Sequence, residues 1–144
     1  MVNELGINCD GGARGNPGPA ASAFVVRVGG KIIYKNSSFL GVATNNVAEY
    51  GGVIAALKWV IENKEKVRGK NIIFFLDSEL ITKQLLGIFK TKNQKLKKLL
   101  ITAKLLESKI SGKIVYNLIP REKNTDADLL VNRNLDNQEK ISRH

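Results

Sequence analysis

"CDGGARGNPGPAASA", residues 9–23, is the stretch that decides how the chain begins to fold. An extended run at residues 4–9 precedes it, and the apolar, β-branched run AASAFVVRV overlaps its end and continues past it. Glycines and prolines between two such runs predict a turn that pairs them as neighbouring strands. No helix follows the glycines directly, as a phosphate-binding loop of the Walker or dinucleotide type would require. The stretch therefore predicts a hairpin, and Gly29-Gly30 predicts a second turn into a third strand.

Downstream of this meander, the hydrophobic pattern alternates between the period of a helix and that of a strand. Apolar residues recur at helical spacing from Val47 to Ile61, with Asn46 and Glu49 placed as the N-cap and third residue of a capping box. The apolar run NIIFFL, residues 71–76, is typical of a central strand buried on both faces. The other expected elements are a short helix ended by Gly87, a helix carrying Leu96 to Leu106, a strand at 113–119 and a helix carrying Ala127 to Leu135. The order β-β-β-α-β-α-α-β-α predicts an α/β fold with a mixed sheet.

Length and composition limit the class of protein. With 144 residues, 43% of them hydrophobic, the chain predicts one domain, assigned to residues 1–136, and a polar tail at 137–144 that we expect to be frayed or disordered. The charge of +10 favours a polyanionic partner, either nucleic acid or an anionic membrane surface. There is no apolar run of 18 residues and no signal-like start, so we expect a cytoplasmic protein. The single cysteine, Cys9, has no partner for a disulfide within the chain, and we expect it to be buried.

Four acids lie at the boundaries of the expected elements: Asp10, Glu49, Asp77 and Asp128. The first and third end apolar strands, and the other two lie in first turns of helices. Ligands of open α/β sheets gather at the carboxyl ends of strands, so this placement indicates a site. Each acid also has a local explanation, as a turn residue, a capping-box partner or a residue near a helix N-terminus.

Taken together, the four acids indicate a metal site. Carboxylates that cluster raise one another's pKa unless a cation neutralises them. Oxygen ligands of this kind suit Mg²⁺ or Mn²⁺ and not zinc, and no cluster of His or Cys competes with that interpretation. The sequence by itself does not establish that the four acids converge.

Four blocks occur in order along the chain: DGGARGNPGPAA, TNNVAEYGGVIAAL, FFLDSELI and PREKNTDADLLVN. On these blocks, and from about residue 4 to residue 136, the chain resembles type 1 ribonuclease H. The resemblance implies a five-stranded mixed sheet in the order 3-2-1-4-5 with helices on both faces. It also implies endonucleolytic hydrolysis of the RNA strand of RNA/DNA hybrids, leaving 5′-phosphate and 3′-hydroxyl ends, as needed to remove RNA in replication and repair.

The resemblance also assigns residues to roles. Two Mg²⁺ ions, for which Mn²⁺ can substitute, would be bridged by Asp10 and completed by the other three acids. Recognition of the RNA 2′-hydroxyl, the group that distinguishes RNA locally from DNA, would involve Glu49 and four residues before it in the chain. These four are Gly15, Asn16, Asn45 and Asn46, and Thr44 would hold a phosphate of the DNA strand. The turn and cap chemistry of Asn45-Asn46 would accompany that contact.

The chain departs from the family pattern in three places. Many members carry a histidine in the loop before the last acid, whereas the only histidine here is His144, so we hypothesise that Arg121 contacts the scissile region; the alternative is a solvated charge. The chain has the short form that lacks a basic helix between the second and third helices, so dispersed lysines must grip the substrate: Lys90, Lys92, Lys95 and Lys98. Glu79 stands where a neutral residue is frequent in the family.

We expect a monomer without an obligatory protein partner.

Two other functions stay open at this point. One is a related metal-dependent nuclease that also cuts duplex RNA; the TNN block argues against a pure DNA substrate but does not exclude duplex RNA. The other is a nucleic-acid-binding module of the same fold without catalysis, whose signature would be the loss of at least one acid. All four acids are present.

Overall fold

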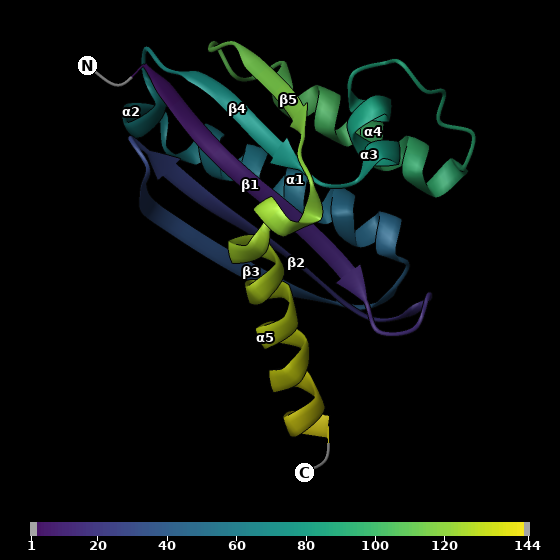
Figure 1. The fold of residues 1–144 in the computed structure, drawn as a ribbon. Coiled ribbons are helices and arrows are strands. Elements are labelled where there is room, and N and C mark those ends of the chain that lie inside the picture. Colours follow the sequence, from purple (N-terminus) through teal and green to yellow (C-terminus); the bar gives the residue numbers. More distant parts are fainter. Residues whose placement is uncertain (1–2, 143–144) are drawn as a thin grey trace.

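A computed structural model describes residues 3–142 as one mixed β-sheet with helices on both of its faces (Figure 1). The elements in chain order are β1 (Glu4–Ala13), β2 (Gly18–Val28), β3 (Lys31–Ala43), α1 (Asn45–Glu62), α2 (Lys64–Val67), β4 (Asn71–Leu76), α3 (Glu79–Leu85), α4 (Gln94–Glu107), β5 (Ile114–Leu118), the 3-10 turn η1 (Arg121–Lys123) and α5 (Thr125–Ser142). None of the helices within the described range is long and apolar enough to cross a membrane.

The sheet has the predicted strand order, β3-β2-β1-β4-β5. The first three strands form the antiparallel meander expected from the two glycine-rich turns. β4 lies parallel to β1, and β5 lies parallel to β4. The carboxyl ends of β1 and β4 therefore meet at the same edge of the sheet, where the first and third boundary acids lie.

Two apolar layers flank the sheet. The larger core packs α1, α3 and α4 against one face and includes the buried, unpaired Cys9, as predicted. α5 (yellow) crosses the opposite face (Figure 1), where Val131 and Leu135 pack on Ala21 and Ala23 of β2. In the central strand β4, alternate residues are buried, but Ile73 and Phe75 on the other face are half-buried. The strand is therefore fully buried on one face and not on both.

Gly11 brings α1 against the end of β1. A Cβ at this position would lie 2.1 Å from the carbonyl oxygen of Ala48 and 2.5 Å from the backbone nitrogen of Glu49. Real Cβ atoms essentially never approach backbone so closely, so only glycine permits this contact. The contact holds Glu49 beside Asp10, its neighbour across the strand–helix junction.

The cap of α1 differs from the prediction. The helix begins at Asn45, and the N-cap is Thr44, whose Oγ1 accepts a hydrogen bond from the backbone N–H of Val47 at 3.2 Å. Asn46 is therefore inside the helix, and Glu49 is neither the third residue of a capping box nor in the first turn. The reason is that Thr44, Asn45 and Asn46 are all good caps, and the local sequence does not choose among them.

Two further helical segments, α2 and the end of α5, also differ from expectation. The short helix α2 has no buried residue and no apolar period, so the pattern did not predict it. α5 continues to Ser142 through most of the tail at 137–144 that we expected to be frayed or disordered. The last turns of α5 are polar and mostly exposed, but Glu139 forms an ion pair with Arg14 at 2.7 Å. His144 lies outside the described residues.

Candidate active site

Three carboxylates meet at the carboxyl ends of β1 and β4. Asp10 lies near the end of β1, Glu49 lies in α1, and Asp77 directly follows β4. Each offers an oxygen, and the three oxygens all lie within 4.8 Å of one another. Asp10 and Glu49 are only 6% and 8% exposed, whereas Asp77 is half-buried. Three hard oxygen donors at this spacing are able to hold a metal ion.

Asp128 lies in the same cavity but outside this triplet. The cavity has a volume of about 480 Å³ and is lined by all four predicted acids. Asp128 is half-buried in the first turn of α5, and its charge contributes to raising the pKa of Asp10. The fold thus gathers all four acids in one hollow and brings three of them within ligand distance of one another.

The electrostatics of the triplet favour binding of a cation. Burial, and next the charge of Asp77, raise the pKa of Asp10 from 3.8 to about 7. Burial, and next the charge of Asp10, raise the pKa of Glu49 well above its usual range. The Oε2 atom of Glu49 is buried and has no hydrogen-bond partner among the residues that the structure describes. A bound metal ion would supply that partner and neutralise the repulsion, so the donor set fits a divalent cation.

The predicted substrate residues are divided between the cavity and its rim. Asn45, Asn46 and Arg121 line the cavity with the acids, whereas the other three, Gly15, Asn16 and Thr44, are not part of its lining. Asn16 nevertheless contacts this group, because its Oδ1 accepts a hydrogen bond from the backbone N–H of Asn45 at 2.9 Å. The turn between β1 and β2 is therefore tied to the start of α1 beside the carboxylates.

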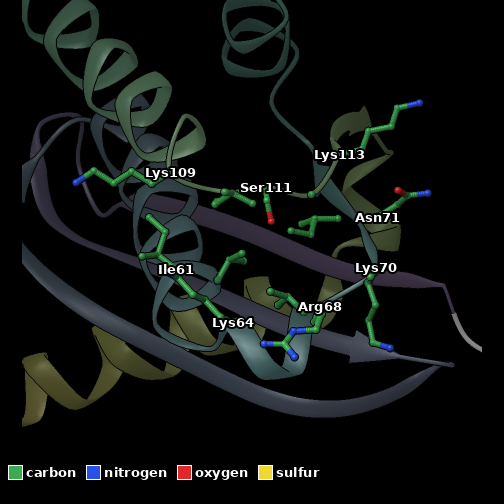
Figure 2. Close-up of a pocket in the computed structure, with 14 residues that line it drawn as sticks. Ile61, Lys64, Arg68, Lys70, Asn71, Lys109, Ser111 and Lys113 are labelled. Carbon is green, nitrogen blue, oxygen red and sulfur yellow. The ribbon is translucent and has the colours of Figure 1, made fainter.

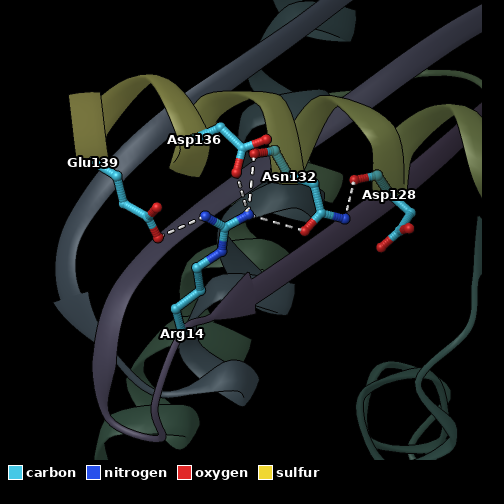
Figure 3. A network of polar contacts seen from close by, with 5 residues as sticks. All are labelled: Arg14, Asp128, Asn132, Asp136 and Glu139. Atoms are coloured by element: carbon cyan, nitrogen blue, oxygen red, sulfur yellow. Dashed lines mark hydrogen bonds and ion pairs between the residues drawn. The ribbon is translucent and has the colours of Figure 1, made fainter. Parts of the chain in front are cut away.

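Arg14 is a residue of the cavity that the sequence did not single out. Figure 3 shows its guanidinium directed at α5, where it forms ion pairs with Asp136 at 2.8 Å and Glu139 at 2.7 Å. The same guanidinium donates to Asn132, whose side chain donates to the backbone oxygen of Asp128 at 3.0 Å. These contacts fasten α5, which carries the fourth acid, to the end of β1. Partners more than 110 residues apart leave no local signal in the sequence.

Asn124 is a second residue that sequence reasoning missed. It precedes α5, is buried, and donates from its Nδ2 to Asp77 Oδ2 at 3.0 Å. The only signal available was a polar residue inside the block that carries Asp128, and asparagine before a helix is ordinarily explained as a cap.

A larger cavity of about 590 Å³ lies at the opposite end of β4 (Figure 2). Its lining carries five basic residues, Lys64, Arg68, Lys70, Lys109 and Lys113. Within the described part of the chain, no Asp or Glu contributes to that lining. A cavity without carboxylates cannot ligate a divalent cation in the way that the smaller one can, so size does not decide the site here.

Known proteins share the fold of this chain. The family model described as reverse transcriptase-like matches residues 8–134. The solved structure of LC11-RNase H1, isolated from compost by a metagenomic approach, superposes with a TM-score of 0.90 at 38% identity, over 95% of this chain and 99% of that one. The chain belongs to the type 1 ribonuclease H family.

Other ribonucleases H are similar over most of this chain. The bifunctional protein Rv2228c of Mycobacterium tuberculosis is 39% identical over 132 residues, which are 90% of this chain and 35% of that protein. Ribonuclease HI of Halobacterium salinarum is 37% identical over 88% of this chain and 62% of its own length. The chain thus spans about a third of the length of Rv2228c. LC11-RNase H1 has also been solved in complex with an RNA/DNA hybrid, with a TM-score of 0.85 at 37% identity, over 90% of this chain and 95% of that one.

Proposed function

We propose that this ribonuclease H hydrolyses the RNA strand of RNA/DNA hybrids by endonucleolytic cleavage, leaving 5′-phosphate and 3′-hydroxyl ends. The observation that carries the proposal is the triplet of Asp10, Glu49 and Asp77 in one cavity with Asp128. The relative LC11-RNase H1, which binds an RNA/DNA hybrid in its solved complex, supports the choice of substrate.

The four acids would hold two Mg²⁺ ions, for which Mn²⁺ can substitute. Such ions supply Lewis-acid stabilisation of the charge that develops on the attacking and leaving oxygens of a phosphodiester. The acids of this chain provide the negative charge that holds the ions, and Asp10 and Glu49 must lose any bound proton to do so. Because burial raises the pKa of both groups, metal binding and proton release are coupled at this site.

The rim of the cavity would select RNA. Asn45 and Asn46 line the same hollow as the acids, and Asn16 is hydrogen-bonded to the first of them. With Gly15 and Glu49, these amides would contact the 2′-hydroxyl of the RNA strand, the group that DNA lacks. Thr44 would hold a phosphate of the DNA strand. The exposed lysines before and within α4 would add phosphate contacts: Lys90, Lys92, Lys95 and Lys98.

A cleavage assay tests the proposed function. The protein is incubated with labelled RNA/DNA hybrid, duplex RNA and duplex DNA in Mg²⁺, Mn²⁺ or EDTA. We expect internal cuts in the RNA of the hybrid alone, only with metal, and products that a 5′-phosphate-dependent exonuclease degrades. An intact hybrid in both metals would refute the proposal, and equal cleavage of duplex RNA would replace it with a broader nuclease.

Replacing Arg121 tests its proposed contact with the scissile region. Arg121 lines the carboxylate cavity, whereas Lys123 in the same turn η1 is exposed and lies outside that lining. We expect Arg121→Ala to lower turnover at saturating hybrid by about tenfold, the effect of losing one hydrogen bond to a charged group. Lys123→Ala should leave turnover unchanged. Equal rates for the two variants would show that Arg121 is a solvated charge.

A further inference from the structure

We infer that Asn124 is a positioning residue, which orients the Asp77 carboxylate for metal binding. The orientation of the Asn124 amide is fixed in turn by hydrogen bonds that lead through Asn8 to Arg27. The inference rests on the proposed function, because it assigns Asp77 to the metal ligands. It concerns a residue that is outside the carboxylate triplet and outside the lining of the cavity.

The contacts of Asn124 use its whole side-chain amide. The residue is 1% exposed. Its Nδ2 donates to Asp77 Oδ2 at 3.0 Å and to the backbone oxygen of Cys9 at 2.8 Å. Its Oδ1 accepts a hydrogen bond from the Nδ2 of Asn8 at 3.0 Å. Both N–H groups therefore have acceptors, one on a proposed metal ligand and one on the backbone of β1, next to Asp10.

Arg27 determines which way both amides face. A guanidinium only donates hydrogen bonds, and Arg27 Nη1 donates to Asn8 Oδ1 at 2.7 Å. Asn8 must then present its nitrogen to Asn124, which in turn must present its oxygen to Asn8 and its nitrogen to Asp77. The backbone oxygen of Cys9 only accepts, so it requires the same orientation from the other end. The second guanidinium nitrogen of Arg27 pairs with Asp126 of α5.

The orientation of the Asn124 amide matters because the Asp77 carboxylate is repelled by neighbouring carboxylates. Asp77 is half-buried, and one of its carboxylate oxygens lies within 4.8 Å of oxygens of Asp10 and Glu49, so these negative charges repel one another. Without a restraint, the Asp77 side chain would relieve the repulsion by turning away. One donated N–H restrains the carboxylate and still leaves it lone pairs for a cation. Groups that hold metal ligands in this way typically change metal affinity or activity by 10- to 100-fold when they are removed.

Direct metal binding tests the inference. Metal-free wild type and Asn124→Ala are titrated with Mn²⁺ by calorimetry, and hybrid cleavage is measured across Mn²⁺ concentrations. We expect the Mn²⁺ dissociation constant to rise by about tenfold in the variant, with the Mn²⁺ requirement of cleavage rising by the same factor. The KM for hybrid at saturating Mn²⁺ should stay unchanged, because the phosphate contacts are intact.

A matched control separates positioning from a general loss of packing. Asn134 of α5 also donates its side-chain amide to the sheet, to Ser37 Oγ at 3.1 Å, but contacts no acid of the cavity. Asn134→Ala should bind Mn²⁺ as wild type does. A dissociation constant for Asn124→Ala within twofold of wild type, or an equal rise in both variants, would overturn the inference.

A second variant serves where the first does not fold. If Asn124→Ala does not fold by circular dichroism, Asn8→Ala replaces it, because that change leaves Asn124 in place but removes the donor to its Oδ1, one of the contacts that fix its amide. We then expect a severalfold rise in the Mn²⁺ dissociation constant, and no rise overturns the inference. If wild type cleaves the hybrid and the variant binds Mn²⁺ as tightly as wild type does, only the positioning role is rejected. If wild type binds no Mn²⁺, the proposed function is rejected as well.

Discussion

Asp10→Asn is expected to abolish hybrid cleavage while making the metal-free protein more stable at neutral pH. Losing the central carboxylate of the triplet should lower turnover by about 10³-fold or more, because metal-assisted stabilisation of the phosphodiester is lost. Binding of the hybrid in EDTA should be largely retained, since it rests on phosphate contacts that weaken with salt. Loss of binding together with cleavage would instead indicate a structural role for Asp10.

The gain in stability follows from the raised pKa of Asp10. Burial and the charge of Asp77 raise that pKa to about 7 in the folded protein, against 3.8 for the solvent-exposed group of the unfolded chain. Between these two values the folded state binds a proton that the unfolded state has released. The free energy of unfolding of the wild type therefore falls as pH rises from about 4 to about 7. Asparagine cannot ionise, so the variant escapes this loss.

Thermal melting in EDTA at pH 5 and pH 7.5 measures the effect. The melting temperature of Asp10→Asn should exceed that of wild type by several degrees at pH 7.5, since 1 kcal/mol corresponds to about 2–4 °C in a domain of this size. The difference should shrink at pH 5, where wild-type Asp10 keeps its proton. Glu122→Gln, the same exchange at an exposed carboxylate of η1, should show no such pH dependence. A variant no more stable than wild type at pH 7.5 would contradict the raised pKa.

Gly11→Ala is expected to cost about 3 kcal/mol of folding free energy, near the upper end for overpacking of a core. The added Cβ would lie 2.1 Å from the carbonyl oxygen of Ala48 and 2.5 Å from the nitrogen of Glu49. Both are backbone atoms of α1, so relief requires the helix to move away from β1. Such a movement would also separate Glu49 from Asp10 and so reduce metal binding.

Gly12→Ala is the matched control for that substitution. At Gly12 the nearest heavy atoms to an added Cβ are 3.9 Å away, which is ordinary van der Waals contact, and the backbone is not left-handed. Its effect on the free energy of unfolding should be within about 1 kcal/mol, with a smaller unfolded-state entropy partly offsetting any loss. Urea denaturation of both variants measures the difference. Similar midpoints for Gly11→Ala and wild type would show that α1 is not held by this contact.

Most of the element order could be predicted because the spacing of apolar residues along the chain reveals it. Alternation and apolar runs mark strands, and the 3.6-residue period marks helices, so the pattern around NIIFFL and around Val47 to Ile61 was sufficient. Prediction was weaker where several residues compete for one role, as Thr44, Asn45 and Asn46 do for the cap of α1. It was also weaker where a helix lacks an apolar stripe, as in α2 and at the end of α5.

Three features could be identified without a structure: four acids near the boundaries of the expected elements, a basic surplus, and blocks that resemble type 1 ribonuclease H. Which of these groups meet depends on the tertiary structure. Asp10 and Asp77 come together because β4 is added parallel to β1, and Gly11 admits α1 with Glu49. The raised pKa of Asp10 arises from burial and from acids far away in the chain, and the hydrogen bonds of Asn124 join residues up to 116 positions apart. No local pattern records such contacts, because hydrogen bonding and desolvation depend on distance in space.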